Sequence, residues 1–132
     1  MSPYVDHFVI VEGNKTWQNN FKQFKFDINN FTKFRDKIIY IPVADLPDGD
    51  DPYKRENYQR NAIMRGLKNS NEDDIVIISD LDEIPNPRKI NSFKPSKKYA
   101  VWRDVRDVSI ILFLFDGMSH RKTCVFEGMS QM

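Results

Sequence analysis

Short apolar runs alternate with polar segments along the whole chain. Five runs rich in branched and aromatic side chains predict strands, the last of them less regular than the others: 4–12, 37–43, 75–78, 98–103 and 108–115. The stretch 120–132 has no clear pattern. Strands that alternate with helical segments indicate an α/β fold with a parallel sheet and right-handed crossovers.

One helix is clearly marked between the second and third strands. Asp51 is suited to cap its N-terminus, and Pro52 to occupy its first position. The helix is predicted to run to about Lys68, and Glu56 lies four residues before Arg60, a spacing that favours an ion pair. The apolar stripe that should face the sheet consists of Tyr58, Ala62, Ile63 and Leu67.

The remaining segments are less regular. We interpret 14–26 as a loop with a short helical turn that leads into an extended piece, and 31–36 as a short amphipathic turn. The acidic loop 45–51 is where a lid would lie, although such charge runs are usually only solvated. A short helical stretch is expected at 88–93.

Composition narrows the class of protein. The 132 residues suit one domain, and a net charge of +1 gives no argument for nucleic acid or an anionic membrane. The single Cys124 excludes an internal disulfide framework. The first eight residues do not resemble a signal peptide, and no apolar run approaches the roughly 20 residues that cross a bilayer. We therefore expect a soluble, cytoplasmic chain without a membrane span.

The strongest chemical signal follows the strand 75–78. Asp80, Asp82 and Glu83 place three carboxylates within four residues at the carboxyl end of this strand, where open α/β sheets bind their ligands. Clustered negative charge is costly unless a cation offsets it, and oxygen ligands of this kind suit Mg²⁺ or Mn²⁺. Such an ion keeps positions open for a substrate diphosphate. The alternative is that these Asp residues only form a turn.

Glu12 ends the first predicted strand before the turn signal Gly13-Asn14. In a parallel sheet it would lie at the same edge as Asp80, because the carboxyl ends of parallel strands share one edge. Glu12 is therefore a candidate for the same site. A solvated acid at a strand end is the alternative.

Four blocks of the chain resemble glycosyltransferase family 17, in the order in which that family carries them. They are V-D-H-F-V-I-V-E at 5–12, the segment 16–26, Y-K-R-E-N-Y-Q-R-N at 53–61, and the D-x-D block D-L-D-E-I-P at 80–85. The chain departs from the family pattern where Trp17 replaces Phe, Asn19 replaces Gly and Tyr53 replaces Trp. The family's first strand and helix have no counterpart, and little matches after about residue 99, so we expect a chain truncated at both ends.

The resemblance implies a Rossmann-like fold of the GT-A type, mostly parallel and incomplete. Residues 1–98 would form the donor-nucleotide-binding portion, and 99–132 a poorly matched segment of the same domain. The implied activity is metal-assisted, inverting transfer of N-acetylglucosamine from UDP-GlcNAc to a glycan or glycoprotein.

The resemblance also implies roles for particular residues. Asp80 and Asp82, supported by Glu83, would hold Mn²⁺ or Mg²⁺ against the donor. For Arg60, the alternative to a place in the donor pocket is an ion pair with Glu56 on the helix surface. The catalytic base is not assigned among Asp104, Asp107, Asp116 and Glu127. The donor pocket would be lined by Glu12, Lys22, Arg60, Asn61 and Asp80.

Two other classes of function remain open. One is a truncated domain that binds a nucleotide sugar, or only a metal, without turning it over. A phosphohydrolase of the haloacid dehalogenase type also places D-x-D after an apolar strand, but it usually carries a small residue and a hydroxyl where this chain has Glu83-Ile84-Pro85.

Overall fold

The computed structural model describes residues 2–70, 74–80, 86, 99–103, 109–114 and 122–128. Side chains are described for 3–70, 74–78 and 86. The predicted helical stretch 88–93 and the acids Asp82 and Glu83 lie outside these residues.

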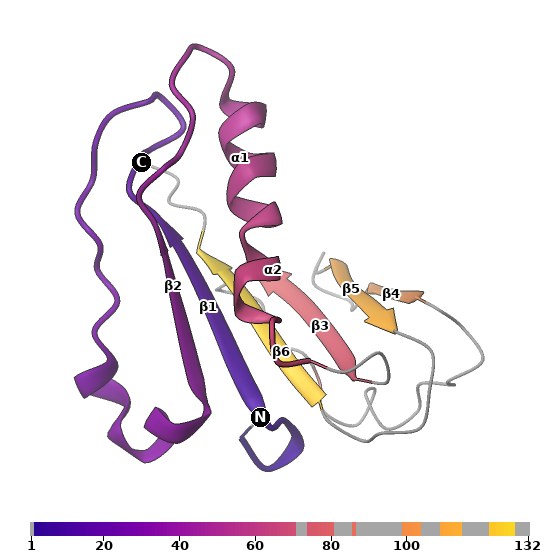
Figure 1. Ribbon diagram of the computed structural model, residues 1–132. Helices are drawn as coiled ribbons and strands as arrows, with labels where there is room; N and C mark the ends of the chain where they lie inside the picture. Colours follow the sequence, from indigo (N-terminus) through magenta and orange to yellow (C-terminus); the bar gives the residue numbers. More distant parts are fainter. Residues whose placement is uncertain are drawn as a thin grey trace.

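Six strands form one mixed sheet in the order β2-β1-β6-β3-β5-β4 (Figure 1). β1 pairs in parallel with β2 and β6, and β6 pairs in parallel with β3, whereas β5 runs antiparallel to β3 and β4. The α/β class is therefore confirmed, and the sheet is parallel over four of its strands. The strands are β1 His7–Gly13, β2 Ile38–Val43, β3 Ile75–Asp80, β4 Tyr99–Arg103, β5 Ser109–Leu114 and β6 Lys122–Gly128.

Five of the six strands lie where the apolar runs predict them. The prediction that the first strand begins at residue 4 is wrong, because Ser2–Tyr4 forms the short 3-10 helix η1 and β1 starts at His7. β6 was not predicted at all, yet it lies between β1 and β3. There Cys124 is in register with Phe8 on one side and Ile77 on the other. The last described strand thus joins the two halves of the sheet.

The predicted helix start is confirmed. α1 spans Pro52–Asn61, and the Asp51 side chain accepts a hydrogen bond from the Tyr53 N–H at 3.0 Å. The prediction of one continuous helix to Lys68 is wrong, because the helix is interrupted at Ala62 and continues as the short α2, Ile63–Gly66. The Ala62 N–H is shared between two carbonyls of the preceding turn. Within the described ranges, no helix is long and apolar enough to cross a membrane.

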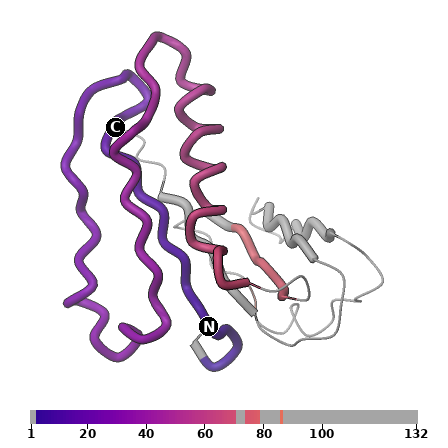
Figure 2. Tube along the Cα trace, viewed as in Figure 1, coloured from indigo at the N-terminus to yellow at the C-terminus, as the bar shows by residue number. Residues whose placement is uncertain are grey.

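The helices cover one face of the sheet and build the main core. In Figures 1 and 2, α1 and α2 lie across the front of the parallel strands. Two members of the predicted helical stripe, Ala62 and Ile63, are buried, while Tyr58 and Leu67 are partly buried against the same cluster. Burial of each such aliphatic side chain contributes about 1.5–3 kcal/mol. The buried core comprises Val9, Val11, Val43, Leu46, Ala62, Ile63 and Val76.

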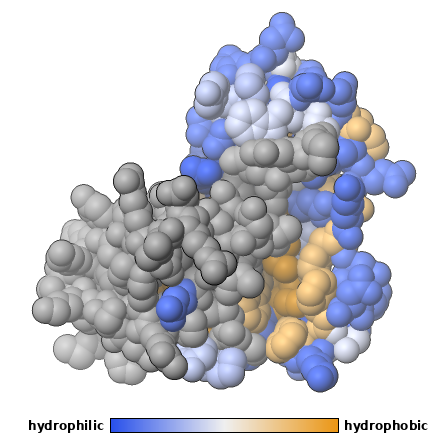
Figure 3. All heavy atoms as spheres, turned by 180° about the vertical axis from the view of Figure 1, so that it is seen from behind, coloured by the Kyte–Doolittle hydropathy of each residue, from blue (hydrophilic) through white to orange (hydrophobic). Residues whose placement is uncertain are grey.

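An aromatic layer covers the opposite face of β1 and β2. It is formed by residues 21–27, here called the strap, and by η2, the 3-10 helix Ile28–Lys37. The Phe26 ring centroid lies 4.8 Å from that of Tyr40 and 5.4 Å from that of Phe31, on which it stacks. The rings of Phe34 and Phe8 pack edge to face with centroids 6.5 Å apart. Seen from behind, Figure 3 shows hydrophobic side chains gathered on this side of the molecule. This face of β1 and β2 is therefore only partly covered, since Phe24, Phe31 and Phe34 stay 39%, 42% and 38% exposed.

The contact between α2 and β1 should be sensitive to a single methyl group. A Cβ built at Gly66 would lie 2.5 Å from Cγ1 of the fully buried Val9. We expect Gly66→Ala to lower the free energy of unfolding by about 1–3 kcal/mol, because α2 must move off the sheet. Chemical denaturation measures this change.

Met64→Ala is the matched control on the same helix, because the Met64 side chain is 62% exposed. Its effect should stay within about 0.5 kcal/mol. Equal stability of the Gly66→Ala variant and the parent chain would contradict the close packing of α2 on β1.

Candidate functional site

The carboxyl ends of β2, β1, β6 and β3 lie along one edge of the sheet, because these four strands are parallel. Asp80 is the last residue of β3 and is in register with Glu127 of β6. Glu12, near the end of β1, is in register with Gly128 of β6. Glu12 and Asp80 therefore share this edge, with one strand between them. Such an edge is the usual ligand position in open α/β sheets.

The Glu12 carboxylate is buried, with the residue 7% exposed. One oxygen accepts a hydrogen bond from the backbone N–H of Lys25 at 2.8 Å. The other accepts from the N–H of Phe26 at 3.1 Å and from the hydroxyl of Tyr40 at 2.8 Å. A buried charge needs such partners, because its loss of hydration is otherwise uncompensated. Glu12 thus fastens the strap to the sheet. Its expected contact with a nucleotide-sugar donor stays a prediction.

Tyr40 shares the environment of this carboxylate. Burial raises the pKa of Tyr40 well above its ordinary value, and the hydrogen bond to Glu12 raises it further. The hydroxyl proton is therefore held in place by the acceptor next to it.

Lys22 is half-buried close to Glu12. Its loss of hydration lowers the pKa of the Lys22 ammonium group, while the charge of Glu12 acts in the opposite direction and Lys25 adds to the lowering. Its backbone N–H donates to the Asn14 carbonyl at 2.8 Å. Lys22 is thus a partly desolvated cation near the edge where β2, β1, β6 and β3 end, here called the functional edge because it is the candidate site. An anionic ligand would stabilise the charge of Lys22.

A tight turn follows β1 and carries the next part of the edge. The Asn19 N–H donates to the Thr16 carbonyl at 3.0 Å, and the Thr16 N–H donates to the Asn20 carbonyl at 2.8 Å. Asn19 adopts a left-handed conformation with φ of 64°. Asn tolerates this conformation better than any residue except Gly. Asn19 can therefore adopt the backbone conformation that a Gly, expected here from the family pattern, would adopt as readily.

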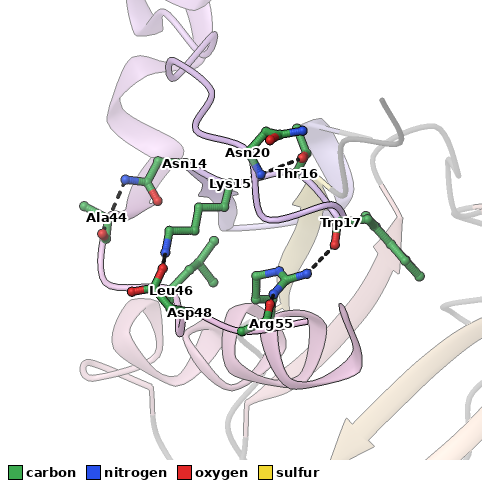
Figure 4. Close-up of polar contacts among 10 residues, drawn as sticks. Asn14, Lys15, Thr16, Trp17, Asn20, Ala44, Leu46, Asp48 and Arg55 are labelled. Atoms are coloured by element: carbon green, nitrogen blue, oxygen red, sulfur yellow. Dashed lines mark hydrogen bonds and ion pairs between the residues drawn. The ribbon is translucent and has the colours of Figure 1, made fainter. Parts of the chain in front are cut away.

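A buried arginine holds this turn against α1. Arg55 is 5% exposed, and its guanidinium donates to the backbone carbonyls of Trp17 and Gly49 (Figure 4). Its Nε atom is buried without a hydrogen-bond partner in the described part of the chain. Lys15 makes a second link, to the Leu46 carbonyl at 3.2 Å and to the Asp48 carboxylate. Two loops at the functional edge are thereby fixed to each other.

These links surround a small pocket that the sequence did not predict. Seven of its lining residues come from the turn and from α1: Lys15, Thr16, Trp17, Pro52, Arg55, Glu56 and Gln59. The available signal was indirect: five of the lining residues, Thr16, Trp17, Arg55, Glu56 and Gln59, belong to two of the four blocks that carry the family resemblance.

The acids of the loop 45–51 are exposed, but the loop itself is held in place. Arg65 binds both oxygens of Asp45, at 3.1 and 2.8 Å, and the Tyr58 hydroxyl donates to Asp45 at 2.6 Å. The hydrogen bonds from Arg65, and then from Tyr58, lower the pKa of Asp45 to about 2. The acids of this loop are therefore not only solvated, because Asp45 also holds the loop against the helices.

Arg60 and Asn61 are exposed at the end of α1. The predicted pair forms, with Arg60 Nη2 3.4 Å from Glu56 Oε1. Because Glu56 lines the pocket, Arg60 is linked to the pocket through its partner. The donor contacts expected of Arg60 and Asn61 stay predictions. No cluster of three metal-ligating side chains occurs among the residues described, which leave out Asp82 and Glu83.

Fold and edge together define the class of protein: an α/β domain whose parallel strands end at a charged edge with a pocket beside the first strand. The family model for glycosyltransferase family 17 matches residues 1–106. The chain belongs to glycosyltransferase family 17. This assignment favours a transferase over a phosphohydrolase.

Two relatives are similar to part of the chain. They are the β-1,4-mannosyl-glycoprotein 4-β-N-acetylglucosaminyltransferases of Homo sapiens and Rattus norvegicus. Each is 33% identical over 92 residues, which cover 61% of this chain and 17% of the relative. The chain therefore spans less than a fifth of these relatives. No solved structure matches the chain significantly.

The hydrogen bonds of Glu12 predict an energetic coupling with Tyr40. Glu12→Gln should lower the free energy of unfolding by about 1–3 kcal/mol. Both carboxylate oxygens of Glu12 accept hydrogen bonds, whereas an amide has only one accepting oxygen. Tyr40→Phe removes one of the same hydrogen bonds. In a double-mutant cycle the two effects should differ from additivity by about 0.5–3 kcal/mol. Denaturation of the four proteins measures this coupling.

Tyr4→Phe supplies the control for the cycle, because Tyr4 is 41% exposed and lies in η1. Its effect should add to that of Glu12→Gln. Additive behaviour of Tyr40 and Glu12 would show that their hydrogen bond contributes little.

The raised pKa of Tyr40 predicts a loss of stability in alkali. Above its ordinary value of 10.0, unfolded Tyr40 releases a proton that the folded chain retains. The free energy of unfolding should therefore fall as the pH rises beyond that value. Tyr40→Phe should make this fall shallower in denaturation curves recorded across that pH range. An identical slope for parent and Tyr40→Phe would refute the prediction.

Proposed function

We propose that this domain takes part in the transfer of N-acetylglucosamine from UDP-GlcNAc to a glycan acceptor. The reaction would be metal-assisted and would invert the configuration at the sugar's anomeric carbon. Membership of glycosyltransferase family 17 and the names of its two relatives support this class of reaction.

The observation that carries the proposal is the position of β3. Its last residue, Asp80, begins D-L-D-E-I-P, and the strand ends at the edge that it shares with β6 and β1. A ligand at this edge would meet Asp80 and the turn after β1 together.

The acids at this edge fit a hard divalent cation. Asp80 and Glu127 are in register on adjacent strands, so two carboxylate residues stand at one level of the sheet. Carboxylate oxygens are the preferred protein ligands of Mg²⁺ and Mn²⁺. Asp80 and Asp82, supported by Glu83, would hold the ion. Once bound, it would neutralise the charge that develops on the departing UDP.

Lys22 supplies a complementary charge on the β1 side. Its ammonium group is partly desolvated, so a phosphate oxygen would restore a favourable partner. Glu12 supports this role indirectly, because it fixes the strap on which Lys22 lies. Arg60 and Asn61 would contact the donor from α1.

The acceptor hydroxyl must lose its proton to a base during an inverting transfer. Four acids were available from the sequence: Asp104, Asp107, Asp116 and Glu127. Of these, Glu127 belongs to the described strands and lies at the functional edge. It is the first residue to test as the base.

The metal site makes a direct prediction about binding. Asp82→Ala should abolish the Mn²⁺-dependent part of UDP binding, because it removes one of two paired carboxylates. Isothermal titration of UDP with and without Mn²⁺ measures this. Asp36→Ala is the control, since Asp36 is an exposed acid just before β2, at the opposite edge of the sheet. Unchanged affinity in Asp82→Ala would remove the metal-site proposal.

Turnover is measured as UDP release from UDP-GlcNAc with a mannosyl glycan acceptor. Release that depends on the acceptor supports transfer. Binding without release would support a domain that holds a nucleotide sugar and leaves catalysis to other parts of a longer protein. Phosphate release from a generic phosphate ester would instead support the phosphohydrolase alternative.

A further inference from the structure

Two partly exposed aromatic rings stand at the pocket: Trp17 lines it, and Tyr53 contacts Trp17. Trp17 is 38% exposed and Tyr53 66% exposed. Their ring centroids are 6.4 Å apart, with an angle of 65° between the planes. Isolated exposed apolar residues are normal on protein surfaces, but Trp and Tyr side by side at a pocket are typical of binding sites. The two rings form an open corner, here called the Trp17–Tyr53 corner.

The backbone under both rings is held in place. The Trp17 carbonyl accepts a hydrogen bond from the buried Arg55, and the Tyr53 N–H is capped by Asp51. Figure 4 shows the Trp17 side chain pointing away from the Arg55 guanidinium. The structure therefore fixes the backbone under the two rings, while each ring keeps part of its surface exposed. A preorganised surface of this kind loses less conformational entropy when a ligand binds.

The pocket next to the corner supplies polar groups of both kinds. Thr16 contributes a hydroxyl, Glu56 a carboxylate and Gln59 an amide. The Glu56 side chain is only 19% exposed, so it faces the pocket from a partly dry position. Apolar rings beside donors and acceptors match a ligand ring that has an apolar face and a polar edge.

We propose that the Trp17–Tyr53 corner binds the face of such a ring, with the polar edge of the ligand directed at Thr16, Glu56 and Gln59. Two parts of the proposed reaction have this chemistry: the uracil base of the donor and the pyranose ring of a sugar. The inference therefore rests on the proposed function and assigns Trp17 and Tyr53 to ligand binding.

The position of the corner suits either ring. Only β6 separates β1, which leads into Trp17, from β3, which ends at Asp80. Neighbouring strands lie about 5 Å apart, so the ends of β1 and β3 are separated by about 10 Å. The turn that carries Trp17 follows β1 at this same edge, so a ligand whose ring lies at the corner can extend its other groups along the edge toward β3.

The test uses ligands that lack phosphate and needs no metal. Uridine and the methyl glycoside of N-acetylglucosamine are each titrated calorimetrically into the full chain. We expect at least one to bind, and Trp17→Ala to weaken that binding about tenfold, within the range measured for one aromatic stacking contact. Tyr53→Ala should weaken it as well. Thermal melts confirm that each variant is folded.

Phe21→Ala is the matched control. Phe21 is 73% exposed and pairs with Lys15 across the same turn, but it does not line the pocket. Its affinity should equal that of the parent chain. Binding of uridine identifies the ring as the base, and binding of the glycoside identifies it as a sugar.

Three results would overturn the proposal: no binding of either ligand at millimolar concentration, unchanged affinity in the folded Trp17→Ala variant, or equal weakening by Phe21→Ala. Asp82→Ala separates this proposal from the metal site. It should leave uridine or glycoside binding intact even where it abolishes the metal-dependent binding of UDP.

Discussion

The hydrogen bonds of the Glu12 carboxylate hold together the two layers around β1 and β2. A buried charge is tolerated only where donors replace its hydration, and here two backbone N–H groups of the strap and the Tyr40 hydroxyl do so. The same bonds bring Phe26 against Tyr40 and complete the aromatic layer. They also determine where Lys22 lies, because it belongs to the strap. One acid at a strand end thus links the packing of the sheet to the charge of the functional edge.

The second constraint is the place of β6. A strand from the far end of the sequence pairs in parallel with both β1 and β3. Its presence puts the end of β1, with its turn and pocket, on the same edge as Asp80. Asp80, the last residue of β3, opens the D-L-D-E-I-P block at this edge. The fold and the proposed site therefore depend on the same long-range pairing.

The loops at this edge are held by charged side chains whose partners are distant in sequence. Arg55 joins the turn after β1 to the loop before α1, and Arg65 ties that loop to the helices through Asp45. Asn19 shows why a departure from a family pattern need not change structure, since Asn and Gly both accept a left-handed backbone. The edge is thus arranged in advance around the Trp17–Tyr53 corner.

Features that depend on neighbouring residues could be predicted before the fold was known. These include the apolar strand before Asp80, the Asp51-Pro52 helix start and the family blocks, because local patterns record propensity, capping and motif spacing. The central place of β6, the burial of Arg55 and the role of Glu12 in holding the strap became visible only in the folded chain. Each of these depends on partners far away along the chain. A periodicity in sequence cannot identify such partners, because burial and long-range hydrogen bonds exist only once the chain has folded.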